Sequence, residues 1–279
     1  MIVVASCVAF SLGCCGKARA HGSQYEQVVE ITAALEKKPG DPGLLLLRAG
    51  LHRSHQDWEA ASQDIAAAEK AGTGAGPLAL ARAELAVSRL EWEAAARELP
   101  VLAREMPENP QAWRLAALVQ TTRKQWTEAV TACRAVIKNA APPLPEDFIL
   151  LARALRAGGA DDEAITTLDE GSQHLGEISV FLEEAAQIEA DRGRWDAAFA
   201  RIDRLIAKSP SSPRWLARKA DLADRAARPE LAAATRRVAL AAMEALPPTR
   251  RNIPAFAELE RTLRAQQSQG TGASGPVQP

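Results

Sequence analysis

The sequence predicts an all-α fold, a solenoid of stacked helical hairpins, on three observations. The composition favours helix, since 47% of the 279 residues are hydrophobic, 25% are charged and only 4% are aromatic, with Ala and Leu abundant. A short block of side chains recurs at a fixed interval of 34 residues. Prolines lie at the predicted unit boundaries, where a helix must stop. Stacked hairpins of this kind bury a core that one hairpin cannot.

The recurring block is an aromatic residue followed three residues later by alanine. It ends at Ala61, Ala95, Ala129 and Ala198, after Trp58, Trp92, Trp126 and Trp195. The gap of 69 residues between Ala129 and Ala198 leaves room for a unit without Trp that ends at Ala164, with one extra residue in the Pro-rich connection 141–145. A degraded sixth unit ends at Ala232. We interpret the periodic tryptophans as packing residues between helices rather than as an aromatic cage.

A second alanine precedes each of these by twelve residues. The set is Ala49, Ala83, Ala117, Ala152, Ala186 and Ala220. Two small residues at fixed offsets indicate two helices whose backbones approach closely. A 34-residue helix–turn–helix unit with these features resembles the tetratricopeptide repeat (TPR), over roughly residues 42–245. The resemblance implies a right-handed α-solenoid, although alanine replaces the glycine usual in the first helix.

The sequence divides into five predicted segments. Residues 1–20 read as a signal peptide, and 21–41 as a helix equivalent to half a repeat. Residues 42–248 form the array of five to six repeats. A closing helix is expected in 249–267, followed by a disordered Gly/Ser/Gln-rich tail over 268–279.

The leader predicts export of a bacterial type. An apolar stretch from Ile2 to Cys15 precedes Ala18-Arg19-Ala20, a pattern typical of signal-peptidase cleavage, although no Lys or Arg precedes the stretch. The expected mature chain begins at His21 and is periplasmic or outer-membrane associated. Ser11-Leu12-Gly13-Cys14 resembles a lipobox, so lipidation at Cys14 is an equal alternative. Membrane anchoring is expected only through this leader.

Composition and motifs argue against several function classes. A net charge of −1 gives no general attraction for nucleic acid. The glycine-rich segment 72–76 follows a helix and lacks the Lys-Ser/Thr of a phosphate loop. No H-E-x-x-H, nucleophile elbow or C-x-x-C occurs. We therefore predict no enzyme activity, no catalytic residue, no cofactor and no metal.

The TPR resemblance implies a ligand groove along the first helix of each unit. Aligning the units places fifteen residues there: Leu46, Gly50, Arg53, Leu80, Glu84, Val87, Arg114, Leu118, Thr121, Ile149, Arg153, Arg156, Glu183, Gln187 and Asp191. Arg114, Arg153 and Arg156 suit the carboxylates of an acidic peptide. A solvated, salt-bridged face is the alternative interpretation. The Lys/Asn clamp of chaperone-binding TPR domains is missing, because Leu46 and Gly50 replace it.

The leading hypothesis is a non-catalytic scaffold that binds a peptide segment or a partner protein in the envelope. Self-association of the solenoid through its ends is the first alternative. A metal protein or enzyme is the second, since His52 and His55 lie three residues apart and His21 would be the mature terminus.

Overall fold

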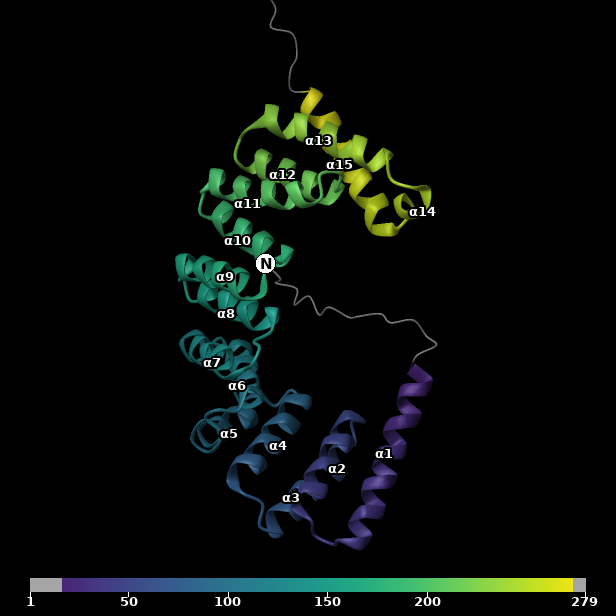
Figure 1. Ribbon diagram of the computed structural model, residues 1–279, viewed down its shortest axis with the longest axis vertical. Helices are drawn as coiled ribbons and strands as arrows, with labels where there is room; N and C mark the ends of the chain where they lie inside the picture. The colour runs from purple at the N-terminus through teal and green to yellow at the C-terminus, as the bar shows by residue number, and fades with distance from the viewer. Residues whose placement is uncertain (1–16, 273–279) are drawn as a thin grey trace, which may run out of the picture. The chain divides into compact units, whose positions relative to one another are not determined.

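The computed structural model describes residues 17–272, and every regular element in that range is a helix. The chain divides into two compact units, one up to Pro143 and one from Leu144 (Figure 1). The predicted all-α fold is therefore confirmed. The apolar part of the leader, Cys14 and residues 273–279 lie outside the described residues. Among the residues described, no helix combines the length and the apolar character needed to cross a bilayer.

Unit 1 consists of one helix and three hairpins. Helix α1 packs against α2, and the hairpins pair α2 with α3, α4 with α5 and α6 with α7. The first helices also contact one another in sequence, α2 with α4 and α4 with α6. The bounds are α1 Lys17–Lys37, α2 Pro42–Ser54, α3 Trp58–Lys70, α4 Ala75–Ser88, α5 Trp92–Glu105, α6 Pro110–Thr122 and α7 Trp126–Asn139.

Unit 2 contains three further hairpins and a closing helix. Its hairpins pair α8 with α9, α10 with α11 and α12 with α13, and α15 packs on α13 and α12. The bounds are α8 Pro145–Ala157, α9 Asp161–Leu175, α10 Ser179–Asp191, α11 Trp195–Lys208, α12 Pro213–Arg225, α13 Pro229–Glu244, α14 Pro248–Arg251 and α15 Pro254–Gly272.

The ends of the array differ in detail from the expectation. Six hairpins lie between Pro42 and Glu244, and the sixth (α12–α13) is helical although it lacks the aromatic residue. Helix α1 begins at Lys17, before the predicted cleavage site. The closing helix α15 continues to Gly272, so the first five residues of the predicted disordered tail are helical. The short helix α14 was not anticipated.

Each first helix ends in the same left-handed turn. The residue at that point has a positive φ in all six hairpins: Gln56, Leu90, Lys124, Gly159, Gly193 and Ala227, at 53–84°. The next residue donates its N–H to the carbonyl five positions back, as Asp57 does to His52 at 2.9 Å and Glu91 to Ala86 at 2.8 Å. These bonds satisfy carbonyls that the helix end leaves unpaired. Four of the six positions hold a residue with a side chain, each at a local conformational cost that the turn must offset.

The paired alanines lie where the helices approach most closely. All twelve alanines of the two predicted series are at most 2% exposed. Six of them belong to the first helices and six to the second. At such positions a larger side chain would meet packed neighbours on every side. The tryptophans open the second helices of four hairpins and are half-buried.

Ion pairs link successive repeats of unit 2 along their second helices. Arg201 in α11 donates to both carboxylate oxygens of Asp169 in α9, at 2.7 and 2.9 Å. Arg228 contacts Asp196 at 2.9 Å in the next hairpin along. Both pairs join residues 32 positions apart. The Arg201 guanidinium lowers the pKa of Asp169, which outweighs the opposing effect of partial burial.

Enlarging one of the buried alanines should destabilise the stack. We expect Ala129→Leu, at a position with 0% exposure in α7, to lower the free energy of unfolding by about 1–3 kcal/mol because the core cannot absorb the added methylenes. The measurement is urea unfolding followed by circular dichroism. The matched control is Ala66→Leu, an exposed position in α3, which should change stability by less than about 0.5 kcal/mol. Equal stability of the two variants would contradict this packing.

The closing helix is tied down by one carboxylate. Glu260 in α15 accepts hydrogen bonds from Arg251 in α14 at 2.6 and 2.9 Å, and from Arg264 at 2.8 and 3.1 Å. Arg264 also reaches Glu244 in α13 at 3.0 Å. Hydrogen bonds from Arg251 and then Arg264 lower the pKa of Glu260 from 4.5 to about 2.

This cluster should make stability depend on pH. Because the pKa of Glu260 is lower in the folded state, its contribution is complete above pH 4.5 and is lost as the pH falls toward about 2. We expect Glu260→Gln to destabilise the protein at pH 7 by up to about 1 kcal/mol. The difference from wild type, measured by urea unfolding at several pH values, should vanish across that window. Glu258→Gln, which breaks an exposed pair with Arg261, is the control and should show little effect at any pH.

Candidate protein-binding face

The first helices of unit 1 form one candidate face, which we call the first-helix face. Helices α2, α4 and α6 lie side by side, and each contributes three positions separated by 34 residues from their equivalents. The positions are Leu46, Gly50 and Arg53 on α2, Leu80, Glu84 and Val87 on α4, and Arg114, Leu118 and Thr121 on α6. The structure thus brings together all of the candidate residues that belong to this unit.

Most of the first-helix face in unit 1 is apolar or small. Leu118 is 44% exposed, a high value for leucine, while Leu46, Leu80 and Val87 are half-buried. A Cβ added at Gly50 would meet no atom within 4 Å, so the surface has free space there. A half-exposed leucine stripe carries apolar surface that a partner could remove from water.

One ion pair crosses this face between consecutive repeats. Arg53 in α2 contacts Glu84 in α4 and also donates to the Ser88 hydroxyl, both at 3.2 Å. The other Glu84 oxygen accepts from Gln111 at the start of α6, at 2.6 Å. These bonds bridge α2, α4 and α6 and fix the side chains that flank Leu80.

The equivalent positions in unit 2 are charged and paired with one another. Arg153 in α8 contacts Glu184 in α10, and Arg156 contacts Asp191. Arg225 in α12 also reaches Asp191, at 2.6 Å. The remaining polar pairs of this face are Arg214 with Glu183, Arg218 with Gln187, and Gln187 with Asp191. Ile149 is the apolar member of the predicted set here, and it is half-buried.

The pKa of Asp191 reflects this network. Partial burial raises it, but the hydrogen bonds from Gln187 and Arg225 and the charge of Arg156 together lower it below the ordinary value. The carboxylate is thus held ionised between two guanidinium groups. Arg153 and Arg156, for which an acidic peptide and a salt-bridged face were the two interpretations, are engaged within the chain, and Arg114 is not free either. Acidic residues 31 and 35 positions further along were the sequence signal for this pairing.

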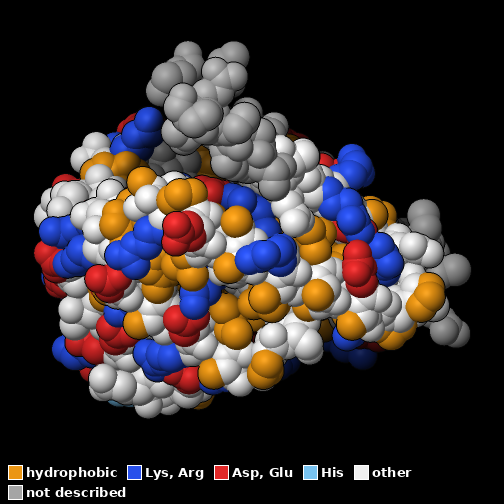
Figure 2. All heavy atoms as spheres, turned by 90° about the horizontal axis from the view of Figure 1, so that it is seen from above, with side chains coloured by type: hydrophobic (Ala, Val, Ile, Leu, Met, Phe, Trp, Pro, Cys, Tyr) orange, Lys and Arg blue, Asp and Glu red, His pale blue; other side chains and the backbone are white. Residues whose placement is uncertain are grey.

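The charges on the molecular surface are mixed in sign. The face in Figure 2 shows Lys and Arg side chains interspersed with Asp and Glu, and apolar side chains between them. This distribution agrees with the net charge of −1. It supplies no extended field of one sign to attract a polyanion.

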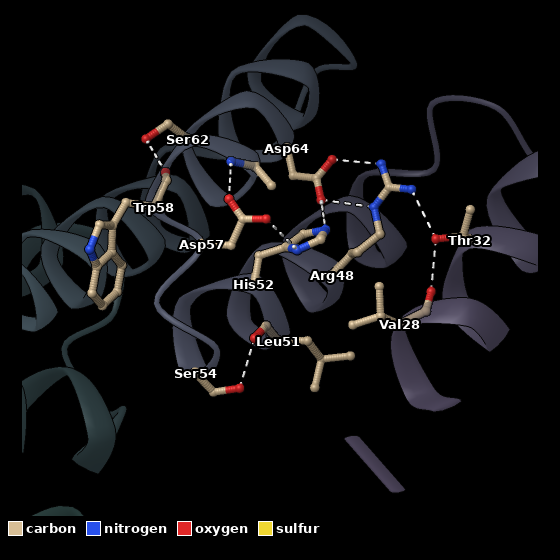
Figure 3. Close-up of polar contacts among 11 residues, drawn as sticks. Val28, Thr32, Arg48, Leu51, His52, Ser54, Asp57, Trp58, Ser62 and Asp64 are labelled. Atoms are coloured by element: carbon tan, nitrogen blue, oxygen red, sulfur yellow. Dashed lines mark hydrogen bonds and ion pairs between the residues drawn. The ribbon is translucent and has the colours of Figure 1, made fainter. Parts of the chain in front are cut away.

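Of the two histidines in α2 and its C-cap, His52 lies in a polar network at the start of unit 1, shown in Figure 3. Arg48 donates to both oxygens of the buried Asp64 at 2.7 and 2.8 Å, and to the Thr32 hydroxyl of α1 at 3.2 Å. The imidazole of His52 lies 3.8 Å from Asp57 and 3.8 Å from Asp64. The bonds join α1, α2 and α3, which is a structural role. Within residues 17–272, no group of three His, Cys, Asp or Glu side chains is placed to hold a metal ion.

Comparison with known proteins identifies the fold. No protein-family model matches the sequence, and no curated protein matches it. Among solved structures, the C-terminal part of a TPR repeat-containing protein from Cytophaga hutchinsonii superposes with a TM-score of 0.64 at 12% identity, over 81% of this chain and 93% of that one. A tetratricopeptide repeat protein from Parabacteroides merdae gives 0.51 at 17% identity, over 88% and 94%.

A third similar structure is Pseudomonas aeruginosa PilF, with a TM-score of 0.51 at 12% identity, over 81% of this chain and 97% of that one. At these identities the likeness concerns the backbone, since few side chains are shared. Within this chain, the helical hairpins and the paired buried alanines repeat with a period of about 34 residues, as the backbone likeness leads one to expect. The chain has the tetratricopeptide-repeat fold.

Proposed function

We propose that the protein is a non-catalytic scaffold that holds a segment of a partner protein on the first-helix face of unit 1. The observation that carries this proposal is the contrast between the two units. Among the candidate positions, unit 1 presents Leu46, Leu80, Val87 and Leu118. Unit 2 presents one apolar residue, Ile149, and otherwise polar or charged side chains that are paired within the chain. Apolar surface that remains accessible gains free energy on binding, and satisfied ion pairs gain little.

The same contrast defines the partner chemistry. An extended segment with two or more large apolar side chains suits the stripe of Leu80 and Leu118. The ion pair of Arg53 with Glu84 flanks the stripe and offers a guanidinium and a carboxylate for the segment's backbone. An acidic segment directed at Arg153 and Arg156 is less favoured, because it would have to displace Glu184 and Asp191.

The proposal places this scaffold outside the cytoplasm. Its support is the apolar stretch Ile2–Cys15 and the A-x-A pattern at residues 18–20. The exported protein takes one of two forms. It is either released into the periplasm with His21 at its N-terminus or anchored to a membrane through a lipid on Cys14.

A charge placed on the stripe should abolish partner capture. We expect Leu118→Asp to lose at least tenfold of the partner crosslinked to a photoreactive residue at position 87, because the carboxylate would be buried beneath an apolar side chain. The measurement is crosslinking in the cells that express the protein, followed by mass spectrometry. The matched control is Leu90→Asp, the same change at a 69% exposed leucine in a turn. Equal capture by wild type and Leu118→Asp would contradict the proposed face.

The processed N-terminus distinguishes the two exported forms. We expect mass spectrometry of the protein isolated from its native cells to find either a chain that begins at His21 or a chain with a diacylglyceryl-modified Cys14 at its start. Fractionation should place the first in the periplasm and the second in a membrane. A chain that retains Met1 and remains in the cytoplasm would contradict export.

A further inference from the structure

A second surface of unit 1 has the properties of a binding site. The second helices α5 and α7 and one side of α6 enclose a cleft of about 390 Å³, which we call the second-helix cleft. Its principal lining residues are Ala96, Pro100, Ala103, Trp113, Ala116 and Glu128. Residues Trp113 and Ala116 belong to a different stripe of α6 from Leu118 and Thr121, because successive residues turn by about 100° around a helix. The cleft is therefore separate from the first-helix face.

The preceding repeat contains an equivalent but narrower cleft. A cleft of about 300 Å³ is lined there by residues that correspond, 34 positions earlier, to those of the second-helix cleft. In that cleft Glu69 and Arg82 form an ion pair at 2.6 Å. Their equivalents are Ala103 and Ala116, so the two long side chains are replaced by methyl groups. The wider cleft thus coincides with the replacement of two long side chains by methyl groups at these positions.

Trp113 gives the second-helix cleft an apolar wall. Its equivalent in the preceding repeat is Ala79. The indole N–H of Trp113 donates to the carbonyl of Pro107 at 2.7 Å, and Asn139 in α7 donates to the same carbonyl at 3.2 Å. Since the single polar group of the indole is satisfied, the ring offers only its apolar surface to a ligand.

The cleft is also lined by the polar side chains of Gln120, Thr127 and Thr131, and it contains one carboxylate and one backbone carbonyl that lacks its usual donor. Pro100 lies inside α5, has no N–H, and so leaves the carbonyl of Ala96 without its ordinary helical donor. The preceding repeat has Ala66 at this position. Glu128 is exposed on α7 and is the only charged side chain lining the cleft. It forms no ion pair within 4 Å among the residues described, and its charge acts at longer range on Arg123, which is paired with Glu93. A carboxylate and an unpaired carbonyl both favour a ligand that carries N–H donors and positive charge.

We infer that the second-helix cleft binds an extended segment of a partner protein in which a large aromatic or aliphatic side chain is followed by Arg or Lys. The volume lies near the lower end of the range for ligand pockets, roughly 300–1,000 Å³, so it takes one or two side chains rather than a whole helix. The apolar side chain of the ligand packs on Trp113, beside Ala103 and Ala116. It occupies the space that corresponds to the positions of the Glu69 and Arg82 side chains in the preceding repeat. The basic side chain is placed beside Glu128 and the Ala96 carbonyl.

The probe for this site is a blocked five-residue peptide with phenylalanine followed by arginine between glycines. Binding to the full chain is followed by NMR through the indole N–H signal of Trp113, assigned by its loss in Trp113→Phe. We expect saturable shifts with this peptide, about fivefold weaker binding when glutamate replaces its arginine, and at least tenfold weaker binding when glycine replaces its phenylalanine. Glu128→Lys should reverse the preference between arginine and glutamate.

The matched variant transfers the ion pair of the preceding repeat into the cleft. Ala103→Glu combined with Ala116→Arg should abolish peptide binding and keep the helical signal, because Glu69 and Arg82 already form that pair on the same backbone. If the double variant unfolds at a lower temperature than wild type, the single variant Ala103→Arg tests the cleft instead. Ala103 is exposed, so the long arginine side chain blocks the cleft without entering the core.

Several outcomes would overturn this inference. We call the double variant Ala103→Glu/Ala116→Arg and the single variant Ala103→Arg the filled-cleft variants. The inference is wrong if these variants bind the peptide as wild type does, or if the Trp113 signal does not shift at millimolar peptide. Loss of peptide binding in Leu118→Asp with retention in the filled-cleft variants would place the peptide on the first-helix face instead. Retention in Leu118→Asp and loss in the filled-cleft variants would support two separate sites.

Discussion

The close approach of two helices within each hairpin is the constraint on which the rest of the structure depends. Twelve alanines, two in each hairpin, are at most 2% exposed, so the backbones meet with only methyl groups between them. That approach requires a tight return of the chain after each first helix. The left-handed residue and the hydrogen bond from the following N–H provide it in all six turns. Four of the six turns accept a side chain at the left-handed position, which shows that packing outweighs local preference there.

The two units share one way of packing their hairpins but carry different residues on their first-helix surfaces. Within each unit, a side chain meets its neighbour about 31 to 35 residues along the chain, one repeat further on. Opposite charges at that separation create the ion pairs of Arg153, Arg156 and Arg225 in unit 2. Apolar residues at the same positions create the leucine stripe of unit 1. Stability comes from the buried small and aliphatic residues common to both units, so the surface residues are free to differ.

The two proposed binding sites follow from the same principle. On the first-helix face, Leu80 and Leu118 hold positions that elsewhere carry Arg, Glu or Gln. In the second-helix cleft, Ala103 and Ala116 hold positions that carry Glu69 and Arg82 one repeat earlier. In both cases an internal equivalent shows the alternative arrangement on the same backbone. In a repeat protein, the equivalent residue of a neighbouring repeat therefore shows what a different side chain does at the same surface position.

The sequence by itself determined the length and register of the hairpins and limited their number to five or six. That information is local and periodic, because the Trp–Ala block, the second alanine and the prolines each repeat on one helix or at its end. For the same reason the candidate residues all lie on first helices. The tertiary structure decided which of the two interpretations holds for the charges of unit 2, since they are paired within the chain. It also decided that Leu90 and Lys124 adopt left-handed backbone and that the cleft beside Trp113 is open. The charge pairs and the cleft depend on side chains of neighbouring repeats, which become adjacent only when the hairpins stack. The left-handed residues depend on how tightly the two helices of one hairpin pack, because a hydrogen bond five residues back closes each turn.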